Sequence, residues 1–98
     1  MNIVNSDQIN ATGTYLQGKV TTTQETLRFA FGDPTYVTGG DKTTTEWVLE
    51  IEGVVCTIYD WKLKDTPWSE YAWHVGGKDY RSVEAVQAVL DICMEDVK

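Results

Sequence analysis

The stretch "TTEWVLEIEGVVCTIYDWK", residues Thr44 to Lys62, decides the fold because its two halves alternate in hydropathy and meet at a glycine. With a two-residue turn at Glu52-Gly53, the segments Thr44–Glu52 and Val54–Lys62 form a hairpin. A slip of one residue would mix the two faces, so the agreement of both halves specifies the register. Glutamate is a poor first residue for such a turn, which leaves a longer tip as the alternative. The register places six apolar side chains on one face: Trp47, Leu49, Ile51, Val54, Cys56 and Ile58.

The opposite face of this hairpin has a mixed character. The register pairs Glu46 with Tyr59 and Thr44 with Trp61. Such a face is too apolar for a bare surface and too polar for an ordinary core. We therefore expect it to be only partly covered by the protein itself and to meet a helix, a second subunit or a ligand. Its members are Thr44, Glu46, Val48, Glu50, Val55, Thr57, Tyr59 and Trp61.

The segments before the hairpin predict a strand followed by a short helix. The stretch Thr12–Thr21 alternates weakly, and we expect it to bend or bulge at Gly18. Thr22 and Glu25 have the spacing of a capping box, and Gly32 stands where a C-cap glycine is typical. The sequence therefore predicts a helix of two to three turns that ends at Gly32. Between this helix and the hairpin, Gly39-Gly40 predicts a turn or mobile loop.

After the hairpin, the sequence predicts one more short strand and a longer helix. The strand "YAWHV", Tyr71 to Val75, places His74 on the side opposite its aromatic neighbours. Asp79 or Ser82 is expected to cap the helix. The helix carries one apolar stripe at three- and four-residue steps: Val83, Val86, Leu90, Cys93 and Val97.

Together these segments predict a single α+β domain over residues 1–98, with residues 1–10 loosely ordered. The fold has a small antiparallel sheet of about four strands around the central hairpin, with one short helix and one longer C-terminal helix. We expect the C-terminal helix to lie on the face that bears Trp47, Leu49 and Ile51.

Composition restricts the partners of this chain. Fifteen acidic against eight basic residues give a net charge of -7, which disfavours nucleic acid polymers and anionic membranes as partners. The sequence has no apolar run long enough to span a bilayer and no signal peptide, so we expect a cytoplasmic protein with Cys56 and Cys93 as reduced thiols. Four Trp and five Tyr against two Phe suit half-buried positions, interfaces and ligand platforms.

The sequence offers little for catalysis. His74 is the only histidine, with Asp60 or Glu46 as conceivable partners, and a structural role for it is the simpler interpretation. No second histidine or cysteine stands at metal-ligand spacing, and no nucleotide-binding glycine motif or serine elbow occurs. We predict no catalytic residues, no metal and no cofactor, and hence a protein that is not an enzyme.

A ligand-binding site is predicted on the mixed face of the hairpin. Glu46 and Tyr59 beside Trp61 form a polar fork at an aromatic wall, suited to a planar base, although a plain surface pair is the alternative. Gly76-Gly77 before Lys78 could present backbone N–H groups to a phosphate, although a plain strand-to-helix turn is the simpler interpretation. The predicted ligand-binding residues are Thr44, Glu46, Tyr59, Trp61, Lys62, Trp73, His74, Gly76, Gly77 and Lys78.

Five motifs in order, "LQG", "FGDP", "EW" preceded by Lys42, "TIYDWK" and "WHVGG", resemble a family of small phage-encoded proteins of no settled function. The likeness runs from Leu16 onward; Asp33 stands where that family commonly has Glu, and the hairpin tip is shorter. The resemblance carries over no catalytic residue.

The resemblance implies a viral accessory protein in the cytoplasm of an infected bacterium. We expect it to counter a bacterial defence by sequestering a small nucleotide-like signal, and to form a homo-oligomer. The alternatives are an acidic inhibitor that binds a host or defence protein, and an enzyme that uses His74.

Overall fold

The computed structural model describes residues 2–37 and 42–96. No helix in these ranges is long and apolar enough to cross a bilayer. The predicted Gly39-Gly40 turn and Val97 of the helical stripe lie outside the described residues. Along the chain the elements are β1 (Ile3–Asn5), β2 (Tyr15–Thr22), α1 (Gln24–Phe31), β3 (Tyr36–Val37), β4 (Thr45–Ile51), β5 (Val54–Tyr59), β6 (Tyr71–Gly77) and α2 (Arg81–Asp96).

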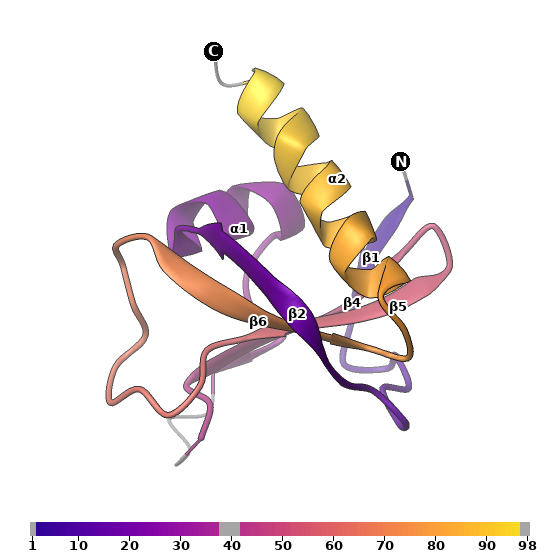
Figure 1. The fold of residues 1–98 in the computed structure, drawn as a ribbon, viewed down its shortest axis with the longest axis horizontal. Coiled ribbons are helices and arrows are strands. Elements are labelled where there is room, and N and C mark those ends of the chain that lie inside the picture. The colour runs from indigo at the N-terminus through magenta and orange to yellow at the C-terminus, as the bar shows by residue number, and fades with distance from the viewer. Residues whose placement is uncertain (1, 38–41, 97–98) are drawn as a thin grey trace.

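All strands belong to one antiparallel sheet, with α1 and α2 on the same side of it (Figure 1). The strand order is β1-β4-β5-β6-β2, and β3 also pairs with β4. The predicted α+β architecture with an antiparallel sheet and two helices is confirmed, but the prediction of about four strands is wrong, because the sheet has six. The additional strands, β1 and β3, have three and two residues, too few for a visible alternation.

The β4–β5 hairpin has the predicted register, from Ile51 opposite Val54 to Glu46 opposite Tyr59. Its two-residue turn is confirmed, because Glu52 and Gly53 both have positive φ angles, 48° and 81°, as a type I′ turn requires. The backbone N–H of Glu52 also donates to the carbonyl of Asn2 at 2.9 Å. Asn2 thereby ties the turn to the start of the chain.

Two sequence predictions fail at the ends of this hairpin. The predicted pair of Thr44 with Trp61 does not form, because β4 begins at Thr45 and the Thr44 amide donates to the buried carboxylate of Asp60 instead. The start of the chain is not uniformly loose, because Ile3 to Asn5 form β1 and pair with β4. Pairing with the β4 edge of the hairpin orders this three-residue segment.

The helix and strand boundaries follow local chemistry. The N-cap of α1 is Thr23, whose hydroxyl accepts from the Thr26 amide at 3.1 Å, one residue later than the predicted capping box. Gly32 ends the helix at φ 84°, as predicted. The predicted irregularity of the early strand is confirmed, because the pairing of β2 with β6 shifts between Leu16 and Gly18.

The core lies between the sheet and the two helices. At its centre, Trp47 and Trp73 are fully buried and meet edge to face, with ring centroids 5.6 Å apart. Truncating either indole to alanine would cost roughly 3–5 kcal/mol. α2 packs on the face predicted for it, since the same cluster contains Trp47, Leu49, Ile51, Val83, Val86, Val89 and Leu90. Both helices pack on this face of the sheet, so the opposite face carries no helix (Figure 1).

Candidate ligand-binding face

Three aromatic rings gather on the face of the sheet that carries no helix. β5 ends at Tyr59, which pairs with His74 on the neighbouring strand β6. The two rings stack with centroids 5.4 Å apart. Trp61 follows β5, with its centroid 6.2 Å from Tyr59 and 6.1 Å from His74. Tyr59 and His74 are half-buried, whereas 38% of Trp61 is exposed. We call these three rings the aromatic platform, and its outer ring is open to solvent.

Two lysines flank the outer ring of the platform. The ammonium nitrogens of Lys42 and Lys62 lie 6.0 and 5.9 Å from the centroid of the Trp61 ring. The Lys62 amide donates to the Lys42 carbonyl at 2.6 Å, which joins the two loops that carry them. Neither ammonium forms an ion pair with a carboxylate of residues 2–37 or 42–96. Although the protein has a net charge of -7, two cations lie beside one aromatic surface with no carboxylate counter-ion from the described part of the chain.

The backbone at Lys62 is strained. Its φ of 54° lies in the left-handed region, where a side chain other than that of glycine costs roughly 1–2 kcal/mol. Such strain persists only where the surroundings hold it, and it is concentrated at functional sites. Here the hydrogen bond to the Lys42 carbonyl supplies part of that restraint.

A buried carboxylate anchors the loops beneath the platform. Asp60 is fully buried and accepts from the amides of Thr44 and Thr45, at 2.7 and 3.2 Å, and from the Thr44 hydroxyl. The hydroxyl of Thr66 lies 2.6 Å from that of Thr44 and 2.8 Å from that of Thr45. Asp60 is therefore bonded to threonines and not to His74, for which the sequence offered it as a partner. This network holds Asp60, which directly precedes Trp61, and Thr44, which lies two residues after Lys42.

The surroundings of His74 favour its neutral form. Burial and the nearby charge of Lys19 lower its pKa below the ordinary value, and Asp60 opposes this shift. Its Nδ1 atom is buried and has no hydrogen-bond partner in the described part of the chain. Glu46, the other carboxylate considered for catalysis, has its pKa raised by burial and lies opposite Tyr59 in the sheet. No nucleophile–base–carboxylate chain is assembled around His74 in the described ranges.

Glu46 also affects its neighbour on the platform. Burial and the Glu46 charge together raise the pKa of Tyr59, so its hydroxyl stays protonated at neutral pH. Glu46 and Tyr59 lie opposite each other in the sheet, as the predicted polar fork requires. Within the described residues, however, they make no hydrogen bond to each other.

Five of the predicted site residues are not part of the platform: Trp73, Thr44, Gly76, Gly77 and, as described below, Lys78. Trp73 is in the core, where its indole N–H donates to the Thr22 carbonyl at 3.2 Å. Thr44 is buried against Asp60. Gly76 and Gly77 are buried residues of β6, not of a turn. A side chain at Gly76 would collide with Thr57, and one at Gly77 would collide with Ser82, so both glycines serve close packing.

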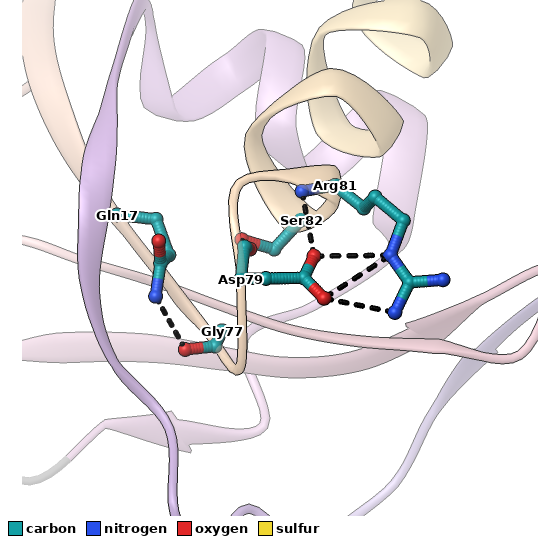
Figure 2. A network of polar contacts seen from close by, with 5 residues as sticks. All are labelled: Gln17, Gly77, Asp79, Arg81 and Ser82. Atoms are coloured by element: carbon teal, nitrogen blue, oxygen red, sulfur yellow. Dashed lines mark hydrogen bonds and ion pairs between the residues drawn. The ribbon is translucent and has the colours of Figure 1, made fainter.

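The link from β6 to α2 also uses its polar groups internally (Figure 2). Gln17 donates to the Gly77 carbonyl at 3.0 Å, and Asp79 accepts from the Arg81 amide at 2.9 Å and from its guanidinium at 2.8 to 3.1 Å. These bonds hold the pKa of Asp79 below its usual value. The predicted phosphate-binding turn is therefore absent, because its glycines are in the strand and Arg81 is paired. Lys78 is exposed but lies outside the platform.

The sequence predicted the rings of the platform and the nearby Lys62, but not the hydrogen-bond network that positions them. Asp60 with Thr45 and Thr66, and the convergence of Lys42 with Lys62, are set by loops whose paths have no periodic signal. Within the described residues, no group of three histidine, cysteine or carboxylate side chains is placed to hold a metal ion. Comparisons with protein-family models, curated proteins and solved structures gave no match.

Proposed function

We propose that this protein binds a small nucleotide-like ligand at the aromatic platform and sequesters it without converting it. The observation that carries the proposal is the partly exposed indole of Trp61 close to the ammonium groups of Lys42 and Lys62, neither of which forms an ion pair within residues 2–37 and 42–96. An aromatic face offers stacking to a planar base, worth roughly 1–3 kcal/mol per base. The two ammonium groups offer charge-assisted hydrogen bonds to phosphate oxygens.

The biological setting of the proposal comes from the motif resemblance described above. A phage accessory protein that captures a nucleotide signal in the bacterial cytoplasm would blunt a defence that depends on that signal. Capture needs affinity and slow release, but it needs no acid–base pair. A neutral His74 stacked on Tyr59 is compatible with a ring that serves as a binding surface.

A thermal-shift panel of linear and cyclic nucleotides tests the proposal. A ligand at about one hundred times its dissociation constant stabilises the native state by about 2.7 kcal/mol, which raises Tm measurably. We expect Trp61→Ala to weaken binding by roughly tenfold or more through loss of stacking. Trp68→Ala is the matched control, because Trp68 is 71% exposed and is in none of the ring–ring contacts of the described residues. Lys62→Ala should also weaken binding, and Lys64→Ala, on the same loop, should not.

The ligand released by denaturation distinguishes sequestration from turnover. Mass spectrometry should recover the nucleotide unchanged after prolonged incubation with the wild-type protein. Recovery of a cleaved product whose formation requires His74 would replace the proposal with an enzymatic function. If no nucleotide in the thermal-shift panel raises Tm, the proposed nucleotide binding is contradicted.

A further inference from the structure

The outer edge of β2 is a second surface, separate from the aromatic platform, at which a partner could bind. This eight-residue strand ends the strand order and pairs only with β6 in the described part of the chain. The edge at the other end of the sheet consists of the short strands β1 and β3, which have three and two residues and both pair with β4. An extended edge strand presents backbone N–H and C=O groups to any chain that can add to the sheet.

A groove follows this edge strand between β2 and α2. Two hollows of 330 and 220 Å³ lie there, and both are lined by Gln87 and Asp91, so they adjoin. β2 contributes Lys19 to the first hollow and Thr21 and Thr22 to the second. Figure 1 shows α2 running above the strand. A groove between an edge strand and a helix accepts a peptide strand, whose backbone pairs with the edge and whose alternate side chains meet the helix.

The charge of the groove identifies the kind of strand that fits. Its carboxylates are Glu84 and Asp91 from α2 and Glu70 from the approach to β6. None of the three forms an ion pair within residues 2–37 and 42–96. Lys19 is the one cation among the lining residues of the two hollows. Tyr80 and Ala88, which are both exposed, add apolar surface to the first hollow.

We propose that β2 binds an extended, basic segment of a partner protein by antiparallel or parallel strand addition. Backbone hydrogen bonds to β2 supply part of the affinity, and Lys or Arg side chains of the segment meet Glu84 and Asp91. A second copy of this chain fits less well, because pairing β2 with itself brings like carboxylates together in a protein that already carries a net charge of -7. A segment matching all of β2 would span about 27 Å at about 3.4 Å per residue.

The test uses two synthetic peptides of alternating residues, one of lysine and valine and one of glutamate and valine. Binding is followed by calorimetry, and amide hydrogen exchange locates it on the chain. We expect the basic peptide alone to bind and to slow the exchange of β2 amides. Glu84→Gln combined with Asp91→Asn should weaken it by about tenfold, as expected for loss of two complementary charges. The charge-matched control, Asp7→Asn with Asp65→Asn, lies on exposed loops away from the groove and should change the affinity less than about twofold.

Three results would overturn the proposal. The first is equal binding of the acidic peptide, and the second is equal weakening by the control pair, which would indicate attraction to the overall charge only. The third is protection of β2 that grows with protein concentration, accompanied by a dimer in sedimentation. That result would assign the edge to a second copy of the chain.

Discussion

Gly76 sets how closely β5 and β6 approach beneath the aromatic platform. A Cβ at this position would collide with the Thr57 hydroxyl and would lie 3.6 Å from Cε1 of Tyr59. Gly76, which the sequence suggested to be part of a turn, therefore leaves room for the Thr57 hydroxyl and for the Tyr59 ring of the platform.

The substitution Gly76→Ala should destabilise the fold by roughly 1–3 kcal/mol, as expected for overpacking between paired strands. Thr57→Ala removes the hydroxyl that the new methyl group would meet. The double variant should then cost less than the sum of the two single changes, and urea denaturation of all four proteins measures that coupling. Strict additivity would contradict the proposed contact.

His74 gives the fold a dependence on pH. Its pKa is lowered in the folded state, by burial first and by Lys19 second, against its ordinary value of 6.5. The unfolded chain therefore binds the proton more readily, and stability decreases as pH falls through 6.5 toward the folded pKa. Asp60 reduces the effect without reversing its sign.

The difference in urea midpoint between about pH 7.5 and about pH 5.5 should be larger in the wild type than in His74→Gln. Carboxylates titrate in both proteins and cancel in the comparison. An equal pH dependence in the two proteins would show that His74 is not desolvated as described.

At the scale of elements, the central hairpin was predictable because its two strands have independent alternating patterns that agree. β1 and β3 were not predictable, because strands of three and two residues depend on a neighbour and not on a pattern of their own. The glycine pair of β6 was interpreted as a turn because the contact that requires it, with Ser82 and Thr57, comes from other elements.

The candidate site was predictable to the same extent. Alternation placed Tyr59 and His74 on the open face, and the same alternation placed Trp73 in the core, although the predicted site included it. The meeting of Lys42 with Lys62 at Trp61 depends on two loops and on the buried Asp60 network, for which the sequence has no local signal.

Substitutions in the turn between β4 and β5 can raise or lower the stability of the protein. Both of its central residues have positive φ, which asparagine tolerates better than glutamate at the first position. Glu52→Asn should raise the unfolding free energy by a few tenths of a kcal/mol, and Gly53→Ala should lower it by roughly 1 kcal/mol or more. Chemical denaturation measures both, and a neutral Gly53→Ala would contradict the observed turn type.

At the scale of the whole molecule, the two helices cover one face of the sheet (Figure 1). The platform occupies the other face, and the β2 groove lies along an edge. The two proposed binding surfaces share Lys19 as a neighbour but no lining ring or carboxylate. Each can therefore be disrupted without the other. A homo-oligomer stays a prediction, to be measured by light scattering.

Cys56 reports on the unfolding of the whole molecule. It is fully buried between the sheet and α2, and burial raises the pKa of its thiol to about 12. In a Cys93→Ser background, Cys56 should react with a disulfide reagent only through opening of the fold. The labelling rate should then follow the unfolding free energy across a urea series. Fast labelling of the native protein would show a local opening of α2. The companion variant Cys56→Ala leaves Cys93, which is partly exposed, as the comparison thiol.

Lys62 occupies a backbone conformation that glycine would adopt with less strain. Selection for thermal tolerance in the laboratory would accordingly favour glycine at this position and discard one of the two cations beside Trp61. Selection for capture of an anion would retain lysine there. Position 62 thus trades thermal stability against anion binding. The residue found there after laboratory evolution would show which of the two properties was selected.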